Sequence, residues 1–182
     1  MLGAPYFLGF AVLVAAIAAA IDWRTGHIPN WVTLVPLGLA PFAHAGVFVA
    51  TGRADQALTQ GAFSVIGAVV CGIVPYALFR AGGLGGGDVK LLVAIGAICR
   101  PMLGIEAQFY GFVVAALVAP ARLAYEGKLL KVMGNTLALV ANPFLPKERR
   151  REITPEMLTW HGLGPAIFVG MSLTAIMHWR SE

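Results

Sequence analysis

The hydrophobic pattern of the chain consists of long runs that carry no Asp, Glu, Lys or Arg. Three such runs cover residues 1–21, 31–52 and 56–79. Each reaches the length of about 20 residues that a helix needs to cross about 30 Å of hydrocarbon. The pattern therefore predicts three membrane-spanning helices. The first run exceeds the core of a cleaved signal segment and follows no basic residue, so we expect it to remain in the mature protein.

The remainder of the sequence predicts three further helices. Residues 162–179 form another apolar run, and residues 88–125 are long enough for two spans. Arg100-Pro101 marks the break between these two, because proline cannot continue a helix interior. We expect an all-α, polytopic membrane protein with six transmembrane helices. No repeat or linker divides residues 1–182, which are predicted to form a single transmembrane domain.

The composition agrees with this class and excludes a soluble domain. Hydrophobic residues make up 58% of the chain and charged residues 12%, outside the range of soluble globular proteins. The two cysteines, Cys71 and Cys99, lie inside apolar runs without partners at metal-ligand spacing. Buried packing is therefore predicted for both, in place of a disulfide or a zinc site.

The basic residues predict the orientation of the spans, because cytoplasmic loops are enriched in Lys and Arg. If residue 1 lies outside, six crossings bring ten of the 13 basic residues to the inner face. These ten are Arg24, Arg80, Lys90, Arg122, Lys128, Lys131, Lys147, Arg149, Arg150 and Arg151. The net charge of +4 is thus explained by topology, and no nucleic-acid partner is expected.

Two inner segments are predicted to contact membrane lipid. Residues 147–152 (KERRRE) are expected to form a solvated loop that attracts anionic headgroups. Residues 127–141 place two lysines among apolar side chains, a pattern typical of an amphipathic helix in the membrane surface.

The three aspartates of the chain fall into two groups. Asp55 belongs to a short outer loop, whereas Asp22 and Asp88 both fall at the inner ends of predicted spans. A charged residue near hydrocarbon costs a few kcal/mol, and such residues usually face a water-filled cavity or a partner. The two acids are therefore candidate functional residues. Taken alone, Asp22 could equally well be an ordinary interfacial residue that pairs with Arg24 and has no functional role.

A glycine cluster precedes Asp88, in the sequence GLGGGDVKLL at residues 83–92. Glycine disfavours helix, so we expect irregular backbone that gives way to helix at Val89. Such backbone is tolerated at membrane depth only where protein or a watery cavity satisfies it. A phosphate-binding loop would need Lys and then Ser or Thr after its last glycine. Asp88 and Val89 occupy those places, which excludes that interpretation.

Two carboxylates that face each other in a restricted site share a proton, because both cannot ionise cheaply at close range. The ionised carboxylate can take a proton from water while the protonated one polarises a carbonyl. This is the chemistry of aspartic peptidases, and it needs neither a metal nor a cofactor. Neighbouring glycines would let the backbone of an extended substrate approach.

These residues resemble a known family. Residues 85–88 (GGGD) match the GxGD signature of intramembrane aspartic peptidases. The continuation VKLLVAIGA, together with Asp22 ahead of residues 28–30 (IPN), resembles the prepilin peptidase family, and the short chain is similar to its tight-adherence pilus branch. The resemblance implies a GxGD peptidase arrangement in which Asp22 and Asp88 are the catalytic pair.

The resemblance also implies a substrate and a location. Type IV prepilin-like precursors would lose their short basic leader at the cytoplasmic face of the inner membrane. Gly85 and Gly87 would support the site. Larger relatives also methylate the new N-terminus and often carry paired cysteines. The loop at residues 23–30 is short and the chain has no CxxC, so methyltransferase activity is not expected.

Three polar residues near the acids are not expected to be catalytic. Lys90 is a candidate for site support, although its position also suits contact with lipid phosphate. His27 is predicted to be solvated, and Asn30 to cap the second span.

Two other function classes remain as alternatives. A small transporter or channel could use both acids to bind protons or a cation. Transport sites usually lie near the midplane, however, and the two halves of the sequence show no repeat, since GGGD and DWR each occur once. An assembly scaffold would leave both acids without a purpose.

Overall fold

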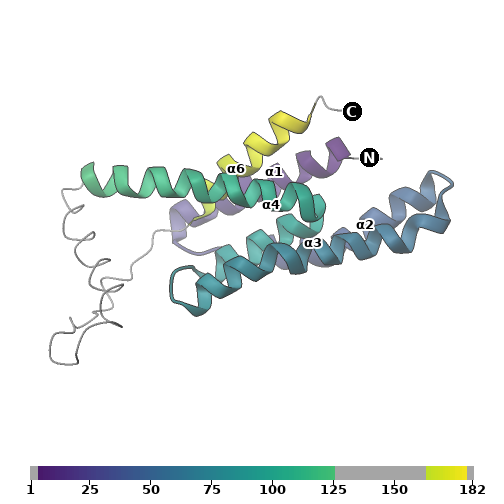
Figure 1. Cartoon of the computed structure of the whole chain (residues 1–182), viewed down its shortest axis with the longest axis horizontal. Coiled ribbons are helices and arrows are strands. Elements are labelled where there is room, and N and C mark those ends of the chain that lie inside the picture. Colours follow the sequence, from purple (N-terminus) through teal and green to yellow (C-terminus); the bar gives the residue numbers. More distant parts are fainter. Residues whose placement is uncertain (1–3, 126–162, 180–182) are drawn as a thin grey trace. The chain divides into compact units, whose positions relative to one another are not determined.

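The computed structural model describes residues 4–125 and 163–179, and every regular element in these ranges is a helix (Figure 1). The helices are α1 (Ala4–Thr25), α2 (Asn30–Ala50), α3 (Ala54–Arg80), α4 (Gly86–Tyr125) and α6 (Gly164–His178). The amphipathic helix and the basic loop predicted for residues 127–152 lie outside the described ranges. The chain divides into two compact units, residues 1–114 with 161–182 and residues 115–160. All contacts discussed below lie within the first unit.

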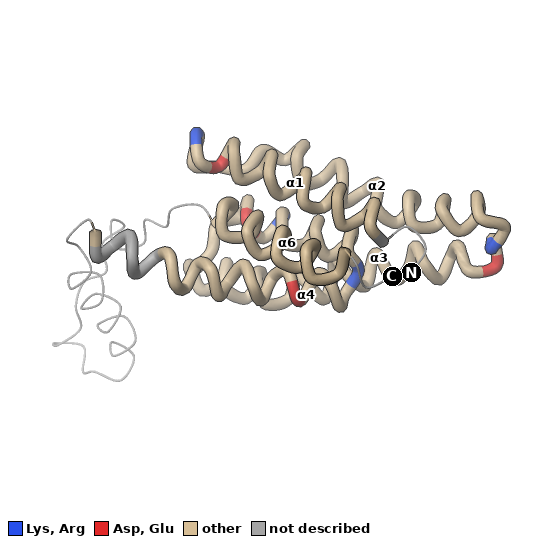
Figure 2. The backbone as a smooth tube through the Cα atoms, turned by 90° about the horizontal axis from the view of Figure 1, so that it is seen from above, with Lys and Arg blue, Asp and Glu red and all other residues tan. Residues whose placement is uncertain are grey.

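Three helices are long and apolar enough to cross a membrane, namely α1, α2 and α3. They correspond to the three runs predicted in the first part of the sequence. Helix α6 is also apolar but has 15 residues, so it is shorter than the apolar run at residues 162–179, from which a span was predicted. Figure 2 shows how few charged residues interrupt the long helices.

Helix α4 contains the break that the sequence predicted. Arg100 has φ 64° and ψ 175°, so residues 86–99 and 101–125 are two helices that meet at a kink. Pro101 disfavours helical backbone in the residue before it, which explains the position of the kink. A Cβ on Gly104 would lie 2.9 Å from the Cα of Gly96, so the two halves approach closely beside the kink.

A polar cluster holds this kink. The guanidinium of Arg100 lies 3.1 Å from Nδ1 of the buried His44, and Nε2 of His44 lies 2.9 Å from the carbonyl oxygen of Ile98. Because a guanidinium only donates, Nδ1 must accept, and Nε2 must therefore carry the proton that is donated to Ile98. The Phe7 ring stacks on His44 with a centroid separation of 3.8 Å. These contacts fix the end of the first half of α4.

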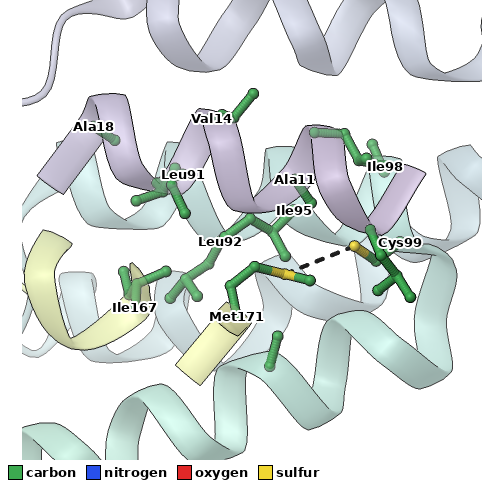
Figure 3. Packing of buried hydrophobic residues seen from close by; sticks show 14 of the residues in the cluster. Ala11, Val14, Ala18, Leu91, Leu92, Ile95, Ile98, Cys99, Ile167 and Met171 are labelled. Carbon is green, nitrogen blue, oxygen red and sulfur yellow. Dashed lines mark hydrogen bonds between the residues drawn. The ribbon is translucent and has the colours of Figure 1, made fainter. Parts of the chain in front are cut away.

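The core forms where α1, α6 and the first half of α4 meet. Figure 3 shows buried side chains from all three helices, including Ala11, Leu91, Ile95 and Met171. Cys71 and Cys99 are both free and buried, which confirms their predicted packing role.

Glycines allow the helices to approach one another. A Cβ on Gly67 would lie 2.1 Å from the carbonyl oxygen of Gly96, and one on Gly170 would lie 2.3 Å from the amide nitrogen of Gly111. Contacts of this kind are typical of membrane helices, which gain little from hydrophobic burial against one another and associate through close packing. They bring α3 against the first half of α4 and α6 against its second half.

Candidate active site

Asp22 lies in the last turn of α1, and the hydrogen bond that ends this helix is made to its backbone carbonyl. Gly26 has φ 70° and donates its N–H to the carbonyl oxygen of Asp22 at 2.8 Å. This is the left-handed glycine that commonly ends a helix. The Asp22 side chain is 6% exposed, and its Oδ2 accepts the N–H of Gly164 at 3.2 Å.

Burial argues against the interpretation of Asp22 as an ordinary interfacial residue. Arg24 is exposed, and no ion pair joins it to Asp22 in the part of the chain that the structure describes. The carboxylate is directed instead into the protein, where its partner is a backbone amide of α6.

Asp88 lies in the first turn of α4, where the helix dipole favours a negative charge. Its side chain is 7% exposed, and Oδ1 accepts the N–H of Leu163 at 3.2 Å. Leu163 and Gly164 are consecutive, so the structure brings together two acids that are far apart in the sequence. Each carboxylate is held by one of two adjacent amides.

The glycine loop before Asp88 begins with the end of α3. Gly82 has φ 77°, and the N–H groups of Gly82 and Gly83 donate to Phe79 and Leu78 at 3.0 and 2.8 Å. This pair of hydrogen bonds is the Schellman motif. The predicted boundary at Val89 is wrong, because α4 already begins at Gly86. The amides of a first helical turn have no partners within the helix, so glycine is tolerated there.

The two glycines assigned to site support occupy different surroundings. A Cβ on Gly85 would lie 3.0 Å from Oδ2 of Asp88, directly against the carboxylate. A Cβ on Gly87 would lie 3.2 Å from Cβ of Ile28 and 3.3 Å from its backbone nitrogen. Gly85 therefore borders the acid, whereas Gly87 allows the segment between α1 and α2 to pack beside α4.

Lys90 is exposed, and its Nζ donates to Oδ1 of Asn30 at 2.8 Å. This contact corrects the role predicted for Asn30, which is the first residue of α2 and does not cap it. The cap position is Pro29, without a side-chain hydrogen bond. Lys90 thus connects the start of α4 to the start of α2. His27 is exposed, as predicted.

Sequence reasoning missed Leu163 and Gly164. Both act through backbone N–H groups, which every residue except proline possesses, so their side chains do not indicate the role. Gly164-Pro165 could have located the start of α6, because proline is common in the first turn of a helix. Nothing in the residue types Gly164 and Pro165 indicates which side chains the start of α6 contacts.

The site can carry out acid–base chemistry with two carboxylates. Within residues 4–125 and 163–179, no group of three His, Cys, Asp or Glu side chains is arranged to hold a metal ion. The residues present could exchange protons with a water molecule and a substrate carbonyl.

Comparison with protein families gives a match that covers both acids. The model of a family described as the type IV leader peptidase family matches residues 9–120, a range that contains both acids and most of α4. Neither the curated proteins nor the solved structures contain a significant match.

Proposed function

Since the chain belongs to the type IV leader peptidase family, we propose that it is a membrane-embedded aspartic endopeptidase that removes the leader of type IV prepilin-like precursors. The observation that carries this proposal is the pair of hydrogen bonds from Leu163 and Gly164, which hold Asp88 and Asp22 side by side in a buried site. Two adjacent carboxylates are what this chemistry requires.

The proposed reaction uses both acids and a water molecule. The ionised carboxylate of the pair takes a proton from water, and the oxygen of that water attacks the scissile carbonyl carbon. The protonated carboxylate gives its proton to the carbonyl oxygen, which yields a tetrahedral diol. Collapse of the diol breaks the C–N bond: one carboxylic acid of the pair gives a proton to the departing nitrogen, and the other carboxylate takes a proton from a diol hydroxyl, which restores the pair. No metal or cofactor takes part.

The proposed topology places this reaction at the inner membrane. The chain would cross six times, with the acids at the cytoplasmic face, where most of the Lys and Arg residues are predicted to lie. A precursor whose leader is basic and precedes an apolar helix could keep that helix in the bilayer while its scissile bond reaches the site. Gly85, which is exposed, leaves room for substrate backbone beside Asp88.

The test is cleavage of a prepilin by the purified protein in detergent, followed by mass spectrometry. We expect a product lighter by the leader. Asp22→Asn and Asp88→Asn preserve the shape of each side chain and remove one titratable group, so either change should abolish cleavage. Asp55→Asn is the control, because Asp55 is an exposed residue in the first turn of α3.

One outcome would contradict the aspartic mechanism, and another would be expected of a transporter. Near-normal cleavage by Asp22→Asn or Asp88→Asn, at equal amounts of folded protein, would refute an aspartic mechanism. A transporter that uses these acids would yield no product with any precursor, and its ion flux would depend on the same two residues.

A further inference from the structure

The start of α6 contacts both acids through its backbone. The amide of Leu163 reaches Oδ1 of Asp88 and the amide of Gly164 reaches Oδ2 of Asp22, each at 3.2 Å. We infer that Leu163 and Gly164 are positioning residues, whose N–H groups set the relative placement of the two carboxylates for reaction. The inference rests on the proposed function and adds a third helix to a site otherwise formed by α1 and α4.

The identity of residue 164 follows from this contact. Gly164 is buried, and a Cβ there would lie 2.8 Å from Oδ2, 3.0 Å from Cβ and 3.2 Å from Cγ of Asp22. Real Cβ atoms essentially never lie within 3.0 Å of another heavy atom that is not a chain neighbour, so alanine would displace the carboxylate or the helix. Glycine at this position is required by the closeness of the acid.

The contact also resolves an energetic problem at the start of α6. The first amides of a helix have no partner within the helix, and leaving such groups buried and unpaired is costly. The residue at the cap position, Leu163, offers no side-chain hydrogen bond, and Pro165 has no N–H. Asp22 and Asp88 therefore cap α6 from two other helices, and the positive end of the helix dipole faces them.

The rest of α6 is held firmly enough to position these amides. Ile167 and Met171 are buried in the core, and Gly170 lies against the backbone of Ala107 and Gly111. At the far end, Nε2 of His178 lies 2.8 Å from Oε2 of Glu106. Contacts on both sides of the core thus fix α6 relative to α4, and each of the two amides engages one carboxylate oxygen.

A matched pair of substitutions isolates one amide. Leu163→Pro removes the N–H that reaches Asp88, and the φ of −79° at this position suits proline. The carbonyl of residue 163, which accepts from Ile167, is kept. Leu163→Ala removes the side chain but keeps the N–H. With a prepilin substrate, we expect kcat of Leu163→Pro to be at least about tenfold below that of Leu163→Ala, because misplaced groups lose rate steeply. KM should be the same within about twofold.

A second pair tests the other amide. Gly164→Ala should lower kcat by at least about tenfold, whereas Gly46→Ala in α2 should leave it unchanged, because a Cβ on Gly46 meets nothing within 4 Å. The melting temperature of each variant is measured in the same detergent. A variant that no longer folds is set aside, and the other pair decides.

The outcomes separate the two proposals. Equal kcat for the two Leu163 variants, or a normal kcat for folded Gly164→Ala, would overturn the positioning role and leave the peptidase intact. A drop seen only in KM would also overturn it, because it would indicate that α6 binds substrate. Failure of the unaltered protein to cleave any prepilin would instead overturn the proposed function.

Discussion

Replacing Gly85 by alanine should slow leader cleavage by moving one carboxylate. The added Cβ would lie 3.0 Å from Oδ2 of Asp88, whereas ordinary contacts begin at 3.4 Å, so the oxygen must move by about 0.4 Å. A displacement of about 1 Å costs roughly 10²-fold in rate. If the logarithm of the rate falls in proportion to the displacement, kcat drops about sixfold, or about 1 kcal/mol of transition-state stabilisation.

The assay compares Gly85→Ala with Gly83→Ala, its matched control in the same loop. A Cβ on Gly83 would meet its nearest neighbour, the carbonyl oxygen of Leu78, at an ordinary 3.5 Å. Initial rates of leader release are measured over a range of prepilin concentrations, with equal amounts of each variant in detergent. A lower kcat for Gly85→Ala alone is expected. If the two variants have the same kcat, the closeness of Gly85 to Asp88 does not limit the reaction.

Three further predictions address topology, metals and packing. In a cysteine-free background, a cysteine introduced at exposed position 24 should react with a membrane-impermeant reagent only from the cytoplasm. A cysteine at exposed position 54 should react only from outside. The reverse pattern would place the two acids on the outer face. Cleavage should persist in the presence of chelators, and loss that a divalent ion restores would indicate a metal-dependent reaction. Gly96→Ala should destabilise the protein by roughly 1–3 kcal/mol relative to Gly46→Ala, because its Cβ would lie too close to the carbonyl oxygen of Gly67. Thermal unfolding in detergent measures the difference. Similar stabilities of the two variants would contradict the close approach of α3 and α4.

The sequence predicted the elements that depend on side-chain chemistry. Long apolar runs identified α1, α2 and α3, and Arg100-Pro101 located the kink in α4 because the restrictions imposed by proline are local. The scarcity of acids drew attention to Asp22 and Asp88, and the structure places both in buried positions. That these acids are catalytic remains a prediction.

Features that depend on contacts between distant segments were not predictable from the sequence. Asn30 has the side chain of a helix cap, yet its oxygen accepts from Lys90, which lies on another helix. The start of α4 at Gly86 contradicts the low helix propensity of glycine, which a position in the first turn makes inexpensive. Leu163 and Gly164 carry no chemical signature, so only the folded chain identifies them.

The polar cluster at the kink has a consequence for how distant substitutions affect the site. Residues 88–100 span 12 steps of about 1.5 Å, so Arg100 lies about 18 Å from Asp88 along the helix axis. One end of this half-helix is held by His44, and at the other end Asp88 accepts from the amide of Leu163. A substitution that changes the direction of the half-helix at the kink would also move Asp88. A residue that never meets substrate can therefore affect the placement of a carboxylate, and a search for rate-altering substitutions in this chain should include the kink at Arg100.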